Sequence, residues 1–279
     1  MNLTDAQLRG RIKNLAKENN ADPRVLMRLY MMERFLERVS VSKYRNNFII
    51  KGGVLVTSML GESLRSTMDI DTTIQNYDLS IENTRRMIES ICDVHIVDGV
   101  TFEITKVAEI MDEMEYPGIR FSLEGCIGRM VTPIKIDVST GDAITPRAVE
   151  FEYKLMLEDR SISLMSYNIE TLLAEKLQTI LARGVLNTRM RDFYDIHVLL
   201  TTRNKDIDKD VIKKAFSETC KNRQTENLTE NAVKIYDSIA DDGRLASLWS
   251  SYQQRYPYVE DLSFDVVLDS LKRLLNVAI

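Results

Sequence analysis

The sequence predicts an α+β protein whose first part mixes strands with helices and whose last part is helical. Two observations lead to this fold class. Strand-type runs separated by glycine occupy much of the chain up to about residue 138, and apolar residues at helical spacing recur from about residue 169 onward. The pattern changes near residue 165. We therefore expect an N-terminal domain over residues 1–165 and a helical C-terminal domain over residues 166–279.

The expected N-terminal domain begins with two amphipathic helices, over residues 5–19 and 22–39. Proline suits the first position of a helix, so Asp22-Pro23 is a good start signal for the second one. Ser80 is the expected N-cap of a later helix. The other elements expected here are strands at 48–50, 69–74, 94–97, 101–107, 119–123 and 130–138, and helices at 53–60 and 80–91.

The expected C-terminal domain consists of helices alone. Each is an apolar-periodic run, and short polar segments separate one run from the next. The runs cover residues 169–183, 189–201, 208–221, 228–240, 243–254 and 264–277.

Composition limits the class of protein. The chain has 279 residues, 44% of them apolar and 28% charged, which is typical of a soluble globular protein. No apolar run approaches the roughly 20 residues that a membrane span needs. Three cysteines without close spacing indicate reduced thiols, so we expect a cytoplasmic protein. The net charge is −5, yet residues 1–51 carry eleven Lys/Arg against five Asp/Glu, which suits either an RNA-facing surface or a solvated pair of helices.

Three carboxylates on two of the expected strands could bind a metal. Side chains two residues apart on a strand face the same side, so Asp69 and Asp71 project together. Asp137 lies in the alternating run from Ile134 to Val138 and faces away from its apolar neighbours. If the two strands are adjacent, the three carboxylates converge, and such hard oxygen ligands suit Mg²⁺ or Mn²⁺. The pattern therefore predicts a metal site for in-line displacement at a phosphorus atom.

A pair of glycines after the first strand offers a place for a polyphosphate. Lys51, Gly52 and Gly53 follow the apolar run at 48–50 and precede an expected helix. Glycine permits a sharp turn and a close approach of backbone N–H groups, and the helix adds its positive end. A nucleoside triphosphate is therefore the expected substrate.

The tripeptide Asp-Ile-Asp occurs twice in the chain. The copy at residues 206–208 lies in a charged stretch between expected helices, with neither a strand nor a glycine turn before it. We interpret that copy as solvated surface. The order of the segments, and not the tripeptide itself, carries the prediction.

The helical part contains a further candidate cation. Lys176 lies toward the border of the apolar face of the helix expected at 169–183. It is either a surface lysine or a cation that reaches the triphosphate. Asp192 and Asp195, three residues apart on the next expected helix, could orient Lys176 or Arg183, or could simply form ion pairs.

Together these motifs resemble the AbiEii family, the nucleotidyltransferase-like toxins of AbiE-type abortive-infection systems, to which the MenT toxins are related. The likeness covers about residues 40–200 through its motifs, and the segment from Trp249 to Phe264 is similar to the family's helical tail. The motifs are Lys51-Gly52-Gly53, Arg65-x-Thr67-x-Asp69-Ile70-Asp71, Ile136-Asp137-Val138 with Gly141-Asp142, Glu175-Lys176-Leu177, and Arg191-Asp192-x-Tyr194-Asp195-Ile196.

The resemblance implies a DNA-polymerase-β-like nucleotidyltransferase fold with a helical C-terminal domain, and Mg²⁺-dependent use of a nucleoside triphosphate. It implies that Asp69 and Asp71 are metal ligands and that Thr67 contacts phosphate. Where polymerase-type transferases carry Gly-Ser in the turn this chain has Gly-Gly, so Thr67 would supply the hydroxyl. The remaining positions that it implies are Lys51, Gly52, Gly53 and Arg65 for nucleotide binding, and Lys176 and Asp192 for catalysis.

Asp137 enters the prediction through strand alternation and not through the resemblance. In this interpretation it is the third metal ligand and accepts the proton of the attacking 3′-hydroxyl. The expected partners are an RNA acceptor, such as the 3′ end of tRNA in some relatives, and an AbiEi-like antitoxin; no membrane is expected.

The leading hypothesis is nucleotidyl transfer to an RNA or protein acceptor by the toxin of a phage-defence system. Two alternatives remain open. A sugar-nucleotide glycosyltransferase also places Asp-x-Asp on a metal-bound diphosphate, and a non-catalytic interaction module could retain the fold. The glycine turn before Asp69 and the intact Lys176 favour the transferase.

Overall fold

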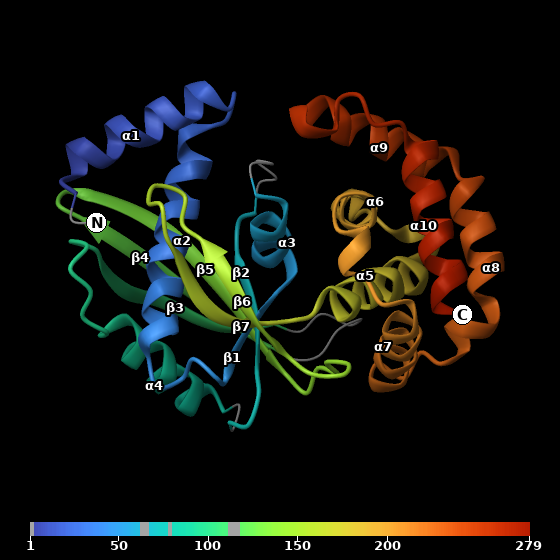
Figure 1. The fold of residues 1–279 in the computed structure, drawn as a ribbon, viewed down its shortest axis with the longest axis horizontal. Coiled ribbons are helices and arrows are strands. Elements are labelled where there is room, and N and C mark those ends of the chain that lie inside the picture. Colours follow the sequence, from blue (N-terminus) through green and yellow to red (C-terminus); the bar gives the residue numbers. More distant parts are fainter. Residues whose placement is uncertain (1–2, 62–66, 78–79, 111–117) are drawn as a thin grey trace. The chain divides into compact units, whose positions relative to one another are not determined.

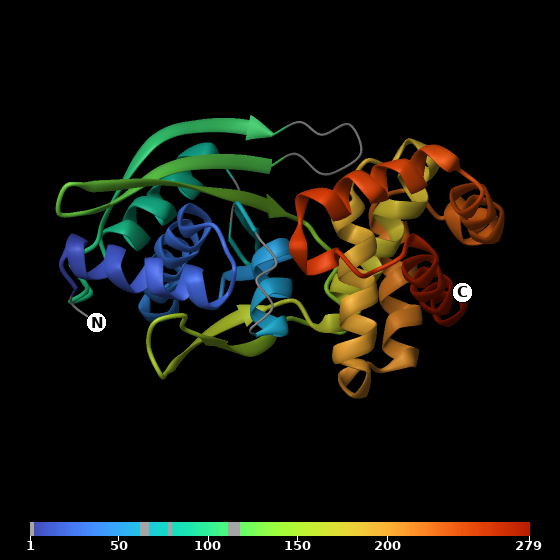
Figure 2. The same ribbon diagram turned by 90° about the horizontal axis from the view of Figure 1, so that it is seen from above.

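The computed structural model describes residues 3–61, 67–77, 80–110 and 118–279. Two compact units make up the chain: Met1–Gly141 with Val149–Ser166, and Asp142–Ala148 with Tyr167–Ile279. The first unit is built on a β-sheet, and the second consists mainly of helices (Figures 1 and 2). In the described part of the chain, no helix has both the length and the apolar character needed to cross a membrane.

A seven-stranded mixed sheet forms the centre of the first unit, with the strand order β3-β4-β5-β2-β1-β7-β6. β2 runs parallel to β5 and β1 runs parallel to β7, whereas the other neighbouring strands are antiparallel. The strands are β1 (Phe48–Lys51), β2 (Ile70–Ile74), β3 (Thr101–Ile110), β4 (Gly118–Ile127), β5 (Met130–Thr140), β6 (Val149–Lys154) and β7 (Ser161–Ser166).

Four helices accompany the sheet: α1 (Asp5–Glu18), α2 (Pro23–Val41), α3 (Gly52–Leu60) and α4 (Ile81–Cys92). α2 packs against β5 and β7 and contacts α1 and α4, so these helices cover one face of the sheet (Figure 1). α3 instead contacts β1 and β2. The apolar residues of β5 alternate toward the face that α2 covers, and they are buried: Ile134, Ile136 and Val138.

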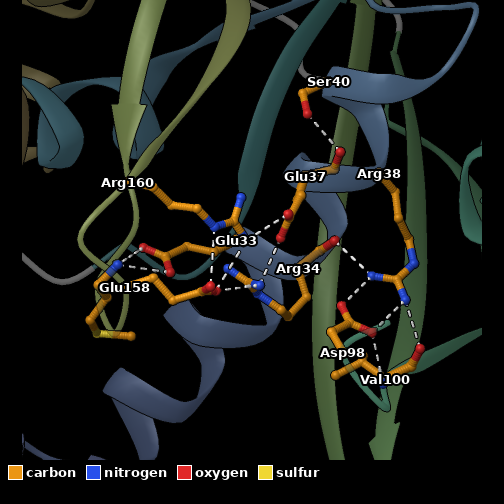
Figure 3. A network of polar contacts seen from close by, with 10 residues as sticks. Glu33, Arg34, Glu37, Arg38, Ser40, Asp98, Val100, Glu158 and Arg160 are labelled. Atoms are coloured by element: carbon orange, nitrogen blue, oxygen red, sulfur yellow. Dashed lines mark hydrogen bonds and ion pairs between the residues drawn. The ribbon is translucent and has the colours of Figure 1, made fainter. Parts of the chain in front are cut away.

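α2 is buried over most of its length, although its sequence is amphipathic. Its central turns contain Glu33, Arg34, Glu37 and Arg38, all of them buried. The two arginines find acidic partners from elsewhere in the unit (Figure 3). Arg38 binds Asp98 through both terminal nitrogens, at 2.9 and 3.0 Å.

The other partners come from the turn between β6 and β7. Glu158 accepts from Arg34 Nη1 at 3.0 Å, and Arg160 Nη2 donates to Glu37 Oε1 at 2.7 Å. Burial alone would raise the pKa of Glu158, but the hydrogen bond from Arg160 and the charge of Arg34 help to hold it below its ordinary value. We call these groups, with Glu33 and the Arg38–Asp98 pair, the α2 network.

The second unit contains α5 (Ile169–Arg183), α6 (Met190–Thr202), α7 (Lys209–Asn222), α8 (Asn227–Ala240), α9 (Gly243–Arg255) and α10 (Phe264–Ala278). α5 packs on α7, and α6 packs on α10. The indole of Trp249 lies in this core and donates to Leu262 O at 2.8 Å. Residues 142–148 belong to this unit because Thr145 O accepts from Asn168 Nδ2 at 2.7 Å and Thr145 N–H donates to Thr171 Oγ1 at 3.0 Å.

The α+β class is confirmed, as are the six helices expected after residue 165, within one or two residues at each end. The strand expected at 94–97 is wrong. Residues 94–96 are irregular and Val97, 69% exposed, lies in a turn; among the described residues no strand pairs with this segment. The hairpin of β6 and β7 was not predicted.

Candidate metal and nucleotide site

Four charged residues form a row across the sheet of the first unit. Asp71 of β2 pairs with Lys51 of β1 on one side and with Asp137 of β5 on the other. Asp137 in turn pairs with Arg120 of β4. Directly opposed residues point to the same side of a sheet, so the row is basic, acidic, acidic, basic on the face away from α2. The expected adjacency of the strands that carry Asp71 and Asp137 is confirmed.

The carboxylate of Asp71 packs directly against the Gly52-Gly53 turn. Gly52 has φ +59°, and a Cβ atom there would lie 2.2 Å from Asp71 Oδ2, so no other residue fits without moving the carboxylate. The next backbone N–H, that of Gly53, donates to Asp71 Oδ2 at 3.1 Å. The paired glycines thus place the start of α3 against the carboxylate, and Lys51 is the N-cap residue of this helix.

Burial of the Asp71 carboxyl raises its pKa to about 6, even though the hydrogen bond from Gly53 favours the ionised form. The negative charge of Asp137 also raises the pKa of Asp71. Asp71 is therefore a carboxylate whose negative charge the protein itself leaves incompletely stabilised.

Asp69 lies immediately before β2 and is partly buried. Burial raises the pKa of Asp69, and the negative charge of Asp137 raises it further. Three basic side chains oppose this shift from nearby: Arg120, Lys135 and Arg28. The two carboxylates of the Asp-Ile-Asp motif are thus surrounded by cations that could also meet phosphate oxygens.

Arg120 holds Asp137. Its Nε donates to Asp137 Oδ1 at 2.7 Å and its Nη2 to Asp137 Oδ2 at 2.5 Å, a bidentate pair. The hydrogen bonds to Asp137 raise the pKa of Arg120 above its ordinary value. With Asp137 turned to this partner, the described residues contain no group of three or more Asp, Glu, His or Cys side chains arranged to hold a metal ion as they stand.

Sequence reasoning did not find Arg120 or Arg28. The alternation of Ile119, Arg120 and Phe121 places the arginine on the polar face of a strand. Only the strand order brings that face beside Asp137, across 17 residues of sequence. Arg28 lies on α2, where its Nη1 contacts Met68 Sδ at 2.9 Å, and nothing in the local sequence connects it with Asp69.

Two other predicted nucleotide-binding residues precede Asp69. Thr67 is buried, and its hydroxyl donates to Asp69 O at 3.3 Å, which fixes the approach of the chain to β2. Arg65 lies outside the described residues.

Lys176, in the second unit, is buried and paired. Its Nζ lies 2.7 Å from Asp192 Oδ1 and 2.7 Å from Asp195 Oδ2. Asp195 is fully buried, whereas the Asp192 side chain keeps 16% of its surface exposed. Both α6 aspartates form the ion pairs with Lys176 that were considered for them, and their role in orienting Lys176 stays a prediction. Its interpretation as a surface lysine is wrong, because α6 covers this side of α5.

The chemistry of the first unit's site fits a small divalent ion. Asp69 and Asp71 offer hard oxygen ligands, and burial raises the pKa of each because it penalises the ionised form. A Mg²⁺ or Mn²⁺ ion bound by both would favour that ionised form. The N-terminus of α3 and the cations around Asp69 suit an anionic substrate that also binds the ion.

Comparisons with known proteins point to one family. The family described as nucleotidyl transferase AbiEii toxin, type IV toxin–antitoxin system, matches residues 34–270. Among solved structures, JHP933 from Helicobacter pylori superposes with a TM-score of 0.50 at 14% identity, over 91% of this chain and 90% of that one. At this identity the likeness concerns the fold alone.

A second H. pylori structure, of a protein assigned only provisionally as a nucleotidyltransferase, gives a TM-score of 0.49 at 14% identity. That alignment covers 91% of this chain and 94% of the other. No curated protein sequence matches this chain.

Proposed function

Because the chain belongs to the AbiEii family of nucleotidyltransferase toxins, we propose that it moves a nucleoside monophosphate from a nucleoside triphosphate to an RNA acceptor with the help of Mg²⁺ or Mn²⁺. The family belongs to type IV toxin–antitoxin systems, so an antitoxin acts against the toxin. We propose that this antitoxin is AbiEi-like, and that the sheet of the first unit is a variant of the DNA-polymerase-β-like fold.

The observation that carries the proposal is the register of β1, β2 and β5. It places Asp71 beside Asp137 and against the Gly52-Gly53 turn, with Asp69 just before the strand. In the proposed reaction Asp69 and Asp71 hold the metal ion, which supplies charge neutralisation on the triphosphate. Backbone N–H groups at the start of α3, together with Lys51, bind phosphate oxygens.

The proposed transfer forms one bond and breaks another. The acceptor hydroxyl oxygen bonds to the α-phosphorus, and the bond from this phosphorus to the bridging oxygen of the leaving pyrophosphate breaks. The hydroxyl proton passes to a carboxylate oxygen, which we assign to Asp137. Thr67 and Arg65 are proposed to assist phosphate binding, as they do in the family pattern.

Lys176 and Asp192 are proposed catalytic residues of the second unit. Their buried ion pair with Asp195 fixes the ammonium group in one place. Replacing Lys176 would leave Asp195 buried without that cation, so a loss of activity in Lys176→Ala would combine catalysis with folding. Asp192→Asn is the cleaner variant because it keeps the Lys176–Asp195 contact and changes only the less buried aspartate.

The test is incubation of the protein with each α-³²P-labelled nucleoside triphosphate, Mg²⁺, and either total RNA or total protein. We expect label in RNA, at least about a thousandfold less label with Asp69→Asn, and a large loss with Asp192→Asn. The chain provides a matched control in its second Asp-Ile-Asp segment. Asp206→Asn changes the same residue type at an exposed position and should transfer label normally.

Other outcomes separate the alternatives. Label in protein would replace the RNA acceptor by a protein one. Transfer of sugar from a labelled sugar nucleotide would favour a glycosyltransferase, and equal labelling with and without Asp69 would contradict the proposed site. The antitoxin proposal is checked by co-expression, since an AbiEi-like protein encoded beside the toxin should relieve growth arrest.

A further inference from the structure

Arg120 binds the third carboxylate of the site through both oxygen atoms that a metal ion would also use. Its Nε and Nη2 engage Oδ1 and Oδ2 of Asp137, so both carboxylate oxygens already carry a short charge-assisted bond. A guanidinium group keeps its proton at any pH that a protein tolerates. It therefore acts as a permanent positive charge at this place.

The surroundings of Arg120 explain why a cation is held there. Besides Asp137, the negative charges of Asp69 and Asp71 both stabilise the protonated guanidinium. Three carboxylates thus act on one arginine. Its side chain is 39% exposed, so it can turn away from Asp137 without disturbing the buried core.

We propose that Arg120 is a tethered counter-cation, which competes with the divalent ion for Asp137 and, once displaced, binds the polyphosphate of the substrate. This inference rests on the proposed function. In the free protein Arg120 balances the charge of Asp137. When Asp137 turns to the metal site, the guanidinium is released beside a triphosphate, whose oxygens accept the same two-pronged hydrogen bond. Metal loading and nucleotide binding are coupled through this one side chain.

The proposal predicts two effects of opposite sign for Arg120→Gln. Without nucleotide, the variant should bind Mn²⁺ about three- to tenfold more tightly than the wild type, because the competing charge is gone. In saturating Ca²⁺, it should bind ribose-labelled fluorescent nucleoside triphosphates about tenfold more weakly, because a phosphate partner is gone. Free Mn²⁺ is measured by electron paramagnetic resonance and nucleotide binding by fluorescence titration.

A structural role for Arg120 would give another result. If the arginine only holds β4 and β5 together, Arg120→Gln should weaken both metal and nucleotide binding, and this outcome overturns the proposal. Unchanged binding of Mn²⁺ also overturns it. Arg120→Lys keeps the charge but loses the two-pronged geometry, so its Mn²⁺ affinity should lie between those of the wild type and Arg120→Gln.

Two controls locate the effect. Arg85→Gln removes an arginine from an exposed ion pair with Glu89 on α4 and should change neither affinity. In an Asp137→Asn background, Arg120→Gln should no longer tighten Mn²⁺ binding, because its effect acts through Asp137. A remaining gain there contradicts the proposed competition.

Failure of the inference is distinguishable from failure of the proposed metal site. If the wild type binds Mn²⁺ no better than Asp69→Asn does, the metal site is wrong and the inference falls with it. If Asp69→Asn abolishes binding but Arg120→Gln does not tighten it, only the role of Arg120 is wrong. Thermal unfolding in EDTA checks that each variant is folded.

Discussion

Two groups of charges in the first unit differ in how they are balanced. The α2 network sets three arginines, Arg34, Arg38 and Arg160, against Glu37, Asp98 and Glu158. A further acid, Glu33, is buried there, and burial raises its pKa to about 8, so it is largely neutral at pH 7. The three arginines and their three acidic partners then carry equal and opposite charge.

The proposed site holds its acids differently. Burial raises the pKa of Asp69 and Asp71, as it does for Glu33 in the α2 network. In the α2 network, Glu37, Asp98 and Glu158 are each paired with an arginine. Asp71 instead accepts a hydrogen bond from the backbone N–H of Gly53. We propose that a divalent ion stabilises the ionised form of the carboxylates in the site.

The largest effect that sharpens this comparison should come from Asp71→Asn. We expect at least about a thousandfold loss of nucleotidyl transfer together with a gain in stability of about 2 kcal/mol at pH 8 in EDTA. Activity falls because a proposed metal ligand is lost, and stability rises because a partly buried, ionised carboxylate with a raised pKa is removed. Chemical denaturation measures the gain, and a loss of stability would contradict our account of the site.

The sign of this gain depends on pH. The folded-state pKa of Asp71 is about 6, above its ordinary value of 3.8. The folded protein therefore holds a proton that the unfolded chain releases, and stability decreases as the pH rises between these values. Below about pH 3 both states are protonated, so Asp71→Asn should give no gain there.

Arg38→Met should have the opposite consequence for the α2 network. Asp98 is fully buried, so removing its arginine leaves a carboxylate without its bidentate partner. We expect a loss of about 3–5 kcal/mol in the free energy of unfolding. Nucleotidyl transfer by the fraction that remains folded should be normal. A defect in transfer without a defect in stability would mean that the α2 network has a functional role.

A smaller effect is expected from Glu33→Gln. The wild type should lose stability as the pH rises from about 4.5 to about 8, because folded Glu33 retains its proton in that range. Glutamine can still accept the bond from Met156 N–H, which lies 3.0 Å from Glu33 Oε1. In the variant, the free energy of unfolding should fall less steeply with pH, by up to about 1.4 kcal/mol per pH unit near neutrality. Denaturation at pH 6.5 and 7.5 measures the slope, and equal slopes would contradict a neutral Glu33.

The smallest effect belongs to an exposed pair. Arg85 and Glu89 are spaced four residues apart on α4, with side chains 55% and 47% exposed. Solvent screens such a pair, so Arg85→Gln should change the free energy of unfolding by less than about 0.5 kcal/mol. Comparison of Arg85→Gln with Arg38→Met tests whether the loss of stability depends on burial of the ion pair and not on ion pairing alone.

Local sequence patterns were sufficient for most elements and failed where pairing decided the outcome. The apolar period of the helices after residue 165 appears in the chain itself, as does the glycine turn before α3. Apolar and charged residues also alternate in β6, with Phe151 and Tyr153 on one face. This alternation was not sufficient to predict the strand, because β6 is stabilised by pairing with β7, which in turn pairs with β1. The segment at 94–97 has strand-type residues but no partner strand among the described residues, and it is irregular up to a turn at Val97.

The same division holds for the candidate site. The spacing of Asp69 and Asp71, the glycine pair and the alternation around Asp137 were sufficient to predict carboxylates beside a turn. The contact of Arg120 with Asp137, the burial of Lys176 between two aspartates and the clash that requires Gly52 are all absent from local sequence. Each joins residues at least 16 positions apart.

The sequence by itself therefore determined which residues can do the chemistry, because residue type and period are local properties. Only the tertiary structure decided which charges meet and which of them are buried. Strand order and burial set the distances and the dielectric surroundings of those charges, and both arise from packing between segments that are remote along the chain.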